Sequence, residues 1–477
     1  MGSGRGHLSL PGAIVLAASF VAASSRAEPS PGSPPLDGRI EIPRSTRTVT
    51  MAQALEYAHA HQPAIRAALA LVAARMEEAK IPGGQWLPTV GVTAQLFAMT
   101  ANNTTATYAQ PAFMDLPRVG ATAATATGTL SPFASTLVGA GISQELFDFG
   151  RIGAQRAAAD ARVEVERHRA ESRRLDVDFS VEEAFFSVSA AEAIVKASDD
   201  AYERSQVHRD LAKRGVDAGL RSPIELTRAE ADLQRFDVGR LRARGGAAVA
   251  RSVLAAAIGA PDAAVEIADV APVPADMPAL PEALAMAQQR DPRLAETIAE
   301  LKAAEEHTRA VGAELRPDLS LTATLSGRAG GAPPSSGTGA RGDGWVPDVP
   351  NWDAGVVLSW PLFDGTVSAR RGGARAMEQV RRDEIDVLRE QDVAAVRQSY
   401  VEVQVANAAL AALRSEAVAA RANYEQADAR FRAGIGNAVE LADAEALRTG
   451  AEIQLALGLF DLARARAAFG RAVAEGL

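Results

Sequence analysis

The sequence predicts a mainly α-helical protein in which long antiparallel helical hairpins continue into a membrane part made of β-strands. Two very long proline-free runs of mixed polarity, at residues 151–214 and 366–432, indicate the hairpins. Short stretches in which polar and apolar residues alternate precede each run and indicate the strands. The whole order occurs twice along the chain, which indicates two structural repeats.

The composition favours long helices packed side by side. Of the 477 residues, 47% are hydrophobic but only 5% are aromatic, and much of the apolar content is alanine. The chain has no cysteine, which excludes disulfides, thiolate metal sites, cysteine nucleophiles and a lipid on an N-terminal cysteine. The sequence also lacks a phosphate-binding loop, a zinc-protease motif and a nucleophile elbow. We therefore expect no enzyme activity, no catalytic or metal-ligating residue and no cofactor.

The N-terminal region has the pattern of an exported protein. Residues 1–27 are interpreted as a signal peptide, with Arg5 before an apolar stretch and small residues at the cleavage site. Its removal takes away two arginines and no acidic residue, which lowers the formal net charge from −9 to −11. Such an acidic protein is a poor partner for nucleic acid. Residues 28–47 are rich in proline and serine and are expected to form a linker.

The first repeat is predicted to span residues 48–260. It begins with a helix over about 48–80, in which Pro63 predicts a kink or a split. Strands follow at about 87–97 and 138–147, and the long hairpin covers 151–258. At 1.5 Å per residue, its first helix would be roughly 95 Å long. The apolar seam of that helix, with steps of four and three, is Val177, Val181, Ala184, Val188, Ala191 and Val195.

The second repeat is predicted to span residues 281–477, after a proline-rich connector at 261–280. A shift of 229 residues superimposes Pro63 on Pro292 and restores the strand alternation. Strands are expected at about 317–326 and 354–363, followed by a long hairpin at 366–474. In its first helix, a series spaced by sevens predicts a packed seam of Val380, Val387, Ala394, Val401 and Ala408.

Each hairpin is predicted to turn at a glycine that lies between a helix stop and a helix start. Gly219 and Gly434 can adopt the left-handed conformation that ends a helix. Three residues later, Ser222 and Asn437 are suitable N-caps. The N3 position, from which a carboxylate can bond back to the cap, carries Glu225 and Glu440.

Aromatic residues gather in or beside the predicted strands, and none of the four tryptophans falls in a predicted helix. Aromatic side chains of membrane strands form girdles at the two membrane surfaces. The residues expected at the membrane interface are Trp86, Phe97, Phe147, Trp345, Trp352, Trp360 and Phe363.

Four strands are too few to close a barrel, since about eight is the smallest number that closes around a filled interior. An open sheet in lipid would leave the hydrogen-bonding groups of its edges unsatisfied. Closure therefore requires further copies of the chain, and three copies would give twelve strands and a twelve-helix tube. The rival interpretation is a periplasmic coiled-coil structural or scaffold protein without a channel. It explains the heptads but neither the alternating strands nor the position of the tryptophans.

From about residue 48 to its end, the chain resembles the TolC family of outer-membrane efflux and secretion channels. The shared features are the duplicated half, the Leu-Phe-Asp strand endings at 146–148 and 362–364, and the glycine tips followed by Glu-Leu. The resemblance implies a homotrimer in bacterial outer-membrane lipid. Its helical hairpins would form an α-barrel in the periplasm, continuous with a 12-stranded β-barrel to which each of the three protomers contributes four strands.

The resemblance also implies a function and partners. The trimer would be the passive export duct of a tripartite efflux pump or of a type I secretion system. Its partners would be a periplasmic membrane-fusion adaptor and an inner-membrane transporter of RND, ABC or MFS type. The choice of cargo would lie mainly in the transporter.

The resemblance places the functional residues at the periplasmic end of the hairpins. The adaptor would bind the tips, although apolar tip residues could instead pack on their own hairpin. Acidic residues beyond the tips would form a gate, repeated threefold as rings of carboxylates. For Glu225 and Glu440, helix capping alone is the alternative. The family's basic gate residue is replaced by Gly436, and its aromatic residue by Phe431 without a hydroxyl. The implied adaptor-binding residues are Ala218, Gly219, Leu220, Ala433, Gly434 and Ile435, and the gate residues are Glu225, Phe431, Glu440 and Asp443.

Overall fold

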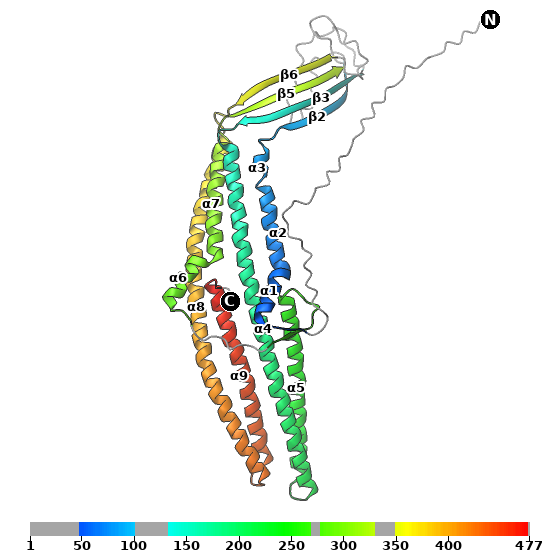
Figure 1. Ribbon diagram of the computed structural model, residues 1–477, viewed down its shortest axis with the longest axis vertical. Coiled ribbons are helices and arrows are strands. Elements are labelled where there is room, and N and C mark those ends of the chain that lie inside the picture. Colours follow the sequence, from blue (N-terminus) through cyan, green and yellow to red (C-terminus); the bar gives the residue numbers. More distant parts are fainter. Residues whose placement is uncertain (1–46, 101–131, 269–276, 330–348, 476–477) are drawn as a thin grey trace, which may run out of the picture. The chain divides into compact units, whose positions relative to one another are not determined.

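The computed structural model describes residues 47–100, 132–268, 277–329 and 349–475 (Figure 1). Residues 44–477 form one compact unit, and the elements below all belong to it. The expected signal peptide at 1–27 and the expected linker up to residue 46 lie outside the described residues, as does Trp345.

The described elements of the first half are two short helices and a third short turn of helix, a strand pair and a long hairpin. In chain order they are β1 (Arg47–Val49), α1 (Met51–His61), α2 (Pro63–Glu78), α3 (Ile81–Gly84), β2 (Thr89–Thr100), β3 (Pro132–Phe147), α4 (Arg151–Asp217) and α5 (Pro223–Ala257).

The second half follows a similar order, with a short strand in place of the first one. Its elements are β4 (Val265–Ile267), α6 (Leu280–Arg290), α7 (Pro292–Ala313), β5 (Asp318–Ala329), β6 (Val349–Ser359), α8 (Gly365–Arg432) and α9 (Ala438–Ala472). None of the described helices contains a stretch that is long and apolar enough to cross a membrane.

Corresponding prolines divide the shorter helices of both halves. Pro63 begins α2 directly after α1, and Pro292 begins α7 directly after α6. Proline suits the first position of a helix because its missing N–H would have no partner there. The backbone before each proline is extended, at Gln62 and Asp291, so each break is a complete interruption of the helix.

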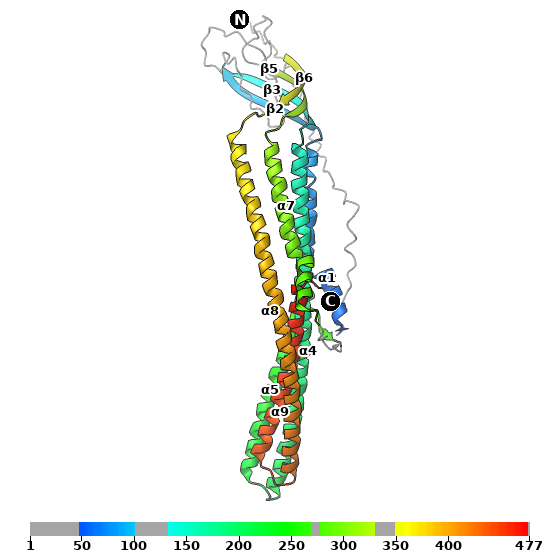
Figure 2. The ribbon, with the colours of Figure 1, turned by 90° about the vertical axis from the view of Figure 1, so that its left-hand side faces the viewer.

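Four helices lie side by side in a single layer near the strands. In this layer, α4 contacts α2 on one side and α7 on the other, and α7 contacts α8 (Figures 1 and 2). Further from the strands, α5 packs on α4 and α9 packs on α8, while α4 also contacts α9. With 67 and 68 residues, α4 and α8 therefore run without interruption from the strands to the hairpin tips.

Two apolar clusters hold the shorter helices against the long ones. The first joins α1, α4 and α5 around Phe185, Leu254 and Ile258. The second joins α6, α8 and α9 and includes Leu410 and Phe469. Since burial of apolar surface contributes roughly 25 cal/mol per Å², these clusters fix the middle of each hairpin.

The two predicted seams differ in burial. In α4, Val181 and Val188 are completely buried. The series spaced by sevens in α8 is not packed within the chain, and the prediction of a packed seam there is wrong for the single chain. A heptad series marks a helix face that can pack, but the pattern does not say whether the partner belongs to the same chain. The exposed fractions are 46% for Val380, 53% for Val387 and 54% for Val401.

The four long strands form an antiparallel sheet in the order β2-β3-β5-β6, so the two halves of the chain meet at β3 and β5. Apolar side chains on one face are exposed, whereas polar side chains of the central strand β5 on the other face are covered, the reverse of a soluble protein. Val90 and Val92 of β2 are both 70% exposed, whereas Thr324 and Ser326 of β5 are 7% and 8% exposed. Among the described residues, β2 and β6 each have a strand neighbour on one side only.

The strands extend differently from the expected ranges. The second strand begins at Pro132 and the third ends at Ala329, so both are longer than the expected ranges of about 138–147 and 317–326. The fourth lies earlier than expected, at Val349–Ser359 instead of about 354–363. Backbone pairing decides these ends, since Val349 is opposite Arg328 in the register. Alternation of side chains alone does not reveal such a partner.

A second, two-stranded sheet has no counterpart in the sequence analysis. β1 pairs with β4 in parallel, with Arg47 opposite Val265 and Val49 opposite Ile267. β1 lies at the border between the expected linker and the expected first helix, and β4 lies in the expected connector. Three-residue strands are too short to show an alternating pattern, so only tertiary pairing defines them.

Candidate functional site

The two hairpin turns have the same backbone structure. Gly219 and Gly434 have φ angles of +71° and +77°, in the left-handed region that favours glycine. The next residue closes each helix by donating its N–H across the last turn, from Leu220 to Gly215 at 2.9 Å and from Ile435 to Arg430 at 3.1 Å. Each turn therefore has the expected glycine at the expected place.

The six expected tip residues are all exposed. Leu220 and Ile435 are the most exposed apolar side chains among them, at 83% and 72%. Neither packs on its own hairpin, so the alternative that these residues pack back is wrong for the single chain. The tips present two apolar side chains to a partner or to a neighbouring copy.

The helix starts after the turns differ from the capping pattern that the sequence suggests. Asn437 caps α9, and its Oδ1 accepts the Glu440 N–H at 2.8 Å. Ser222 occupies the N-cap position of α5, but its side chain makes no cap hydrogen bond. The Glu225 carboxylate binds the Arg221 guanidinium at 2.8 Å instead of the cap. The Glu440 carboxylate lies 3.2 Å from the Arg430 guanidinium. Nearby arginines compete for both carboxylates, and the expectation that they bond back to the caps is wrong.

Arg221 connects the two hairpins at their tips. Its guanidinium carbon lies 3.8 Å from the centroid of the Phe431 ring, and its Nη2 donates to the Phe431 carbonyl oxygen at 2.9 Å. The same guanidinium binds Glu225, so it is held from both sides. We call these three residues, Arg221, Glu225 and Phe431, the tip clamp. Phe431 itself is 2% exposed and packs against Tyr424 and Leu441.

Sequence reasoning missed Arg221. Its position in the first tip corresponds to that of Gly436 in the second, where the sequence analysis looked for a basic residue. A side chain at Gly436 would not fit, because an added Cβ would lie 2.9 Å from the Phe431 backbone nitrogen. The basic residue of this region therefore comes from the other hairpin, and comparison of the two tips could have found it.

Asp443 differs from the other acidic residues of the expected gate. It is exposed on α9 and has no hydrogen-bond or ion-pair partner among the described residues. Glu225 and Glu440 are paired with arginines, so part of their charge is neutralised locally. Of the acidic residues expected at the gate, Asp443 therefore has the most freely available negative charge.

A buried polar network joins the hairpins further from the tips. Arg204 of α4 donates to both oxygens of Glu445 of α9, with Nε at 3.0 Å from each. Glu445 is 1% exposed and also accepts from Thr449 at 3.1 Å. Next to it, His208 of α4 and the Tyr424 hydroxyl of α8 are 3.1 Å apart. We call these five residues, Arg204, His208, Tyr424, Glu445 and Thr449, the inter-hairpin network.

The network holds one fixed arrangement of charge near neutral pH. Burial raises the pKa of Tyr424 to about 12, together with the nearby Glu445 carboxylate. Burial lowers the pKa of His208, which keeps its ring neutral at pH 7. A buried ion pair with a missing partner costs about 3–5 kcal/mol, so Arg204 and Glu445 resist separation. Beyond this network, the tip clamp is the next polar connection toward the tips.

The expected interface aromatics lie at the sheet and its two borders. Trp86 precedes β2 and is 38% exposed, and Phe147, at the end of β3, is 52% exposed. Trp352, Trp360 and Phe363 are 74%, 58% and 86% exposed. Trp360 and Phe363 follow β6 instead of lying within it. The side chain of Phe97 and the whole of Trp345 lie outside the described residues.

The described residues offer no arrangement for metal binding, because no group of three histidine, aspartate or glutamate side chains could hold an ion. What the geometry provides is a pair of connected helical tips at one end and a sheet with an exposed apolar face at the other. This combination defines a class of protein that places its strands in a membrane and its helices outside it.

The family model described as Outer membrane efflux protein matches residues 54–260 and 283–475, and the chain belongs to this family. The two matched segments correspond to the two repeats. The resemblance to the TolC family is thereby confirmed, and the protein is located in the bacterial outer membrane. The members of this family are channels and not enzymes.

Solved structures of outer-membrane channels share the fold. The Campylobacter jejuni CmeC channel is 16% identical, with a TM-score of 0.69 over 90% of this chain and 86% of that one. The Neisseria gonorrhoeae MtrE channel in its open state is 19% identical, with a TM-score of 0.66 over 90% and 89%. At these identities the likeness concerns the fold.

A curated relative matches part of the chain. The fusaric acid resistance protein FusA of Burkholderia cepacia is 27% identical over 228 residues. The match covers 47% of this chain and 40% of the length of that relative.

Proposed function

We propose that three copies of this chain form a passive export duct across the outer membrane. Their strands would close a 12-stranded β-barrel in the lipid, and their helices would continue it as an α-barrel in the periplasm. A periplasmic adaptor would bind the tips, and an inner-membrane transporter would supply the cargo and the energy. Membership of the efflux family supports this proposal at the level of the whole chain.

The observation that carries the proposal is the four-stranded sheet with its apolar face outward. Val90 and Val92 on the β2 edge and Val356 and Leu358 on the β6 edge are between 59% and 70% exposed. In lipid, the unpaired backbone groups of β2 and β6 would each cost several kcal/mol. Pairing β6 of one copy with β2 of the next removes both edges. Two copies give about the smallest closed barrel, whereas three leave room for a pore.

The helices provide a second reason for several copies. The exposed apolar series of α8, which includes Val380 and Val387, lies on a helix at the border of the four-helix layer (Figure 2). Among the described helices, α8 packs mainly on α6, α7 and α9, and it reaches α4 close to the tips, where Tyr424 meets His208. A neighbouring copy whose α2 lies beside this face would cover the series and continue the layer into a closed ring.

The tips supply the gate in this proposal. The inter-hairpin network keeps the hairpins together, while the tip clamp connects the last turns that lie beyond it. Release of Arg221 from Phe431 would let the first tip move away from the second while the network stays intact. The exposed Leu220 and Ile435 would be the contacts through which the adaptor drives this movement.

Small-molecule efflux is favoured over type I secretion of polypeptides by one observation. The curated relative is named for resistance to fusaric acid, a small organic acid by its name. We therefore place the chain in a tripartite efflux pump as the first choice. Secretion of polypeptides is the second choice.

The test is assembly and conductance of the purified full-length protein. We expect a heat-resistant trimer in the outer-membrane fraction and stepwise conductance after insertion into planar lipid bilayers. Crosslinking of cysteines placed at β2 and β6 should give a covalent trimer. A monomer or dimer in the periplasmic fraction, with no conductance, would overturn the proposal and favour a coiled-coil scaffold.

A further inference from the structure

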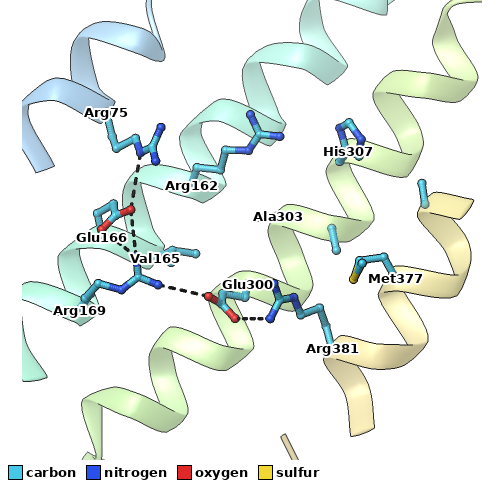
Figure 3. Close-up of a pocket in the computed structure, with 12 residues that line it drawn as sticks. Arg75, Arg162, Val165, Glu166, Arg169, Glu300, Ala303, His307, Met377 and Arg381 are labelled. Carbon is cyan, nitrogen blue, oxygen red and sulfur yellow. Dashed lines mark hydrogen bonds and ion pairs between the residues drawn. The ribbon is translucent and has the colours of Figure 1, made fainter. Parts of the chain in front are cut away.

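A cavity of about 290 Å³ is lined by residues of α2, α4, α7 and α8 (Figure 3). These residues belong to the half of the helices that is nearer the sheet. Its lining contains four arginines and one histidine against two glutamates. We call it the basic pocket. In a protein with a formal net charge of −9, a concentration of cationic groups in one hollow requires an explanation.

The basic pocket lies on the concave side of the helix layer. Its lining includes Arg75 from α2 and Arg381 from α8, the two outer helices of the layer. Side chains of α2 and α8, at opposite borders of the layer, can reach the same hollow only if the layer curves around it. In the proposed trimer, the concave side of this layer is the wall of the duct.

Three of the arginines are fixed in place by the two glutamates. Glu166 lies 3.6 Å from Arg75 and 3.2 Å from Arg169. Glu300 lies 3.4 Å from Arg169 and 2.9 Å from Arg381. The resulting chain of ion pairs crosses the pocket from α2 to α8, as the dashed lines in Figure 3 show. Each of these arginines also binds a glutamate outside the pocket lining, at 2.7 Å for Arg75–Glu78, 2.8 Å for Arg169–Glu296 and 2.6 Å for Arg381–Glu384.

The other two basic side chains of the lining are unpaired in the part of the chain that the structure describes. Arg162 of α4 and His307 of α7 both line the pocket, and neither has a hydrogen-bond or ion-pair partner among the described residues. Both are exposed to the hollow and not to an opposing carboxylate. In Figure 3 they lie above Arg169, Glu300 and Arg381, at about the height of Arg75.

The remaining lining is apolar. Val165, Ala303 and Met377 come from three different helices and face the same space as the arginines. A hydrophobic surface beside a cationic group suits a ligand with an apolar body and one negative group. The volume corresponds to the lower end of the range for small-ligand pockets, about 300 Å³.

We propose that the basic pocket binds small amphipathic organic anions, such as carboxylic acids, on their way through the duct. Arg162 and His307 bind the carboxylate, and the Val165, Ala303 and Met377 side chains contact the apolar body. That the basic pocket lies in the wall of a duct rests on the proposed function. That a single chain binds the anion does not depend on it. Glutamates offset the charge of the three paired arginines, so Arg162 supplies the positive charge that holds the anion in the pocket.

Calorimetric titration of the purified full-length protein at pH 7 tests the proposal. Sodium benzoate is the probe, and benzamide is its neutral control of nearly the same shape. We expect benzoate to bind at least tenfold more tightly than benzamide. The double variant Arg162→Ala/His307→Ala should weaken benzoate binding at least tenfold. Equal binding of the two compounds, or no binding of benzoate, would overturn the proposal.

A matched variant separates the pocket from general charge. Lys302→Ala/Arg375→Ala removes two cationic side chains of α7 and α8 that are exposed, unpaired within the described residues and outside the pocket. It should bind benzoate within twofold of the unaltered protein. An equal loss in both double variants would also overturn the proposal. Circular dichroism spectra of both variants should match that of the unaltered protein.

Conductance distinguishes this proposal from the proposed function. Protein that conducts but does not bind benzoate would contradict the pocket and leave the duct intact. Protein that binds benzoate through Arg162 and His307 but does not conduct would contradict the duct and leave the pocket intact. If both hold, benzoate should reduce the single-channel current of the unaltered protein more than that of the pocket variant.

Discussion

The Arg221 guanidinium covers the ring of Phe431 at 3.8 Å and donates to the carbonyl oxygen of the same residue at 2.9 Å. One side chain of the first hairpin thus binds both the side chain and the backbone of the second. The contact lies beyond the buried Arg204–Glu445 pair, at the end of the hairpins that the proposal assigns to the gate.

Replacement of Arg221 should open the proposed gate. Loss of the ring contact and the charged hydrogen bond destabilises the closed state by about 1–2 kcal/mol relative to the open state. The open population should therefore increase roughly tenfold. We expect Arg221→Ala to raise the mean conductance in planar bilayers. Arg221→Lys retains the charge but not the planar contact and should give an intermediate value. Unchanged conductance in Arg221→Ala would remove the tip clamp from the gating mechanism.

Polar replacement of the exposed tip side chains should abolish efflux without affecting assembly. Leu220→Asp/Ile435→Asp introduces charge where the adaptor would bury apolar surface, which costs several kcal/mol of binding. A deletion strain complemented with this variant should lose its resistance phenotype while heat-resistant trimers persist. Leu241→Asp, at a 58% exposed position of α5 away from the tip, is the control and should retain resistance. Full resistance in the tip variant would contradict adaptor binding there.

The tip glycines should tolerate asparagine but not valine. Asparagine adopts the left-handed conformation readily, whereas a β-branched residue is strained there by about 1–2 kcal/mol. No heavy atom lies within 4 Å of a Cβ added at Gly219 or Gly434, so the backbone and not crowding decides the outcome. We expect resistance to survive Gly219→Asn/Gly434→Asn and to be lost in the double valine variant. Equal loss in both would show that any side chain at these positions blocks the adaptor.

Asp443 should contribute to ion selectivity. Among the described residues, it is the acidic residue of the expected gate without an ion-pair partner, and repeated three times it would attract cations to the entrance of the duct. We expect Asp443→Asn to reduce the cation preference measured from reversal potentials in a salt gradient, and Glu440→Ala/Asp443→Ala to reduce it further. Asp461→Asn, roughly 27 Å further along α9, is the control. Identical reversal potentials for Asp443→Asn and the unaltered protein would rule out the ring.

Removal of the Glu182 charge should stabilise the protein at high pH only. Burial raises the pKa of Glu182 to about 7, with a further contribution from the Asp178 carboxylate. The folded state therefore binds a proton between pH 4.5 and 7 that the unfolded state does not, and its stability falls as the pH rises through this window. Glu182→Gln should be more stable than the unaltered protein by about 2 kcal/mol at pH 8 and equal to it at pH 4.5.

Thermal or denaturant unfolding in detergent at both pH values measures this difference. The neighbouring Glu183 is 37% exposed and pairs with Arg464 at 2.8 Å, so Glu183→Gln is a matched control that should not stabilise the protein at pH 8. A pH-independent difference between Glu182→Gln and the unaltered protein would contradict the raised pKa.

Much of the fold could be inferred because its signals are local and long. Proline-free runs at 151–214 and 366–432 indicated helices, and α4 and α8 cover Arg151–Asp217 and Gly365–Arg432. The alternation around Val92 indicated a two-faced strand in the same way. The pairing of β1 with β4 left no such signal, since three residues show no period and their partners lie more than 200 positions apart.

The tip clamp was missed for a related reason. Glycine and cap residues act within a few positions, so Gly219, Gly434 and Asn437 could be recognised in the sequence. Arg221 acts on Phe431, which is 210 positions away, and nothing in its immediate neighbourhood indicates this contact. The same applies to the basic pocket, whose residues come from four helices.

The duplicated tips are not equivalent, because Arg221 stands in one where Gly436 stands in the other and the glycine site has no room for a side chain. Each copy of the chain therefore carries a single clamp, and three copies carry three identical ones. Identical clamps that release independently would produce intermediate current levels between closed and fully open. Clamps that release together would produce only the two extreme levels, so recordings from a single duct reveal how strongly the three protomers are coupled.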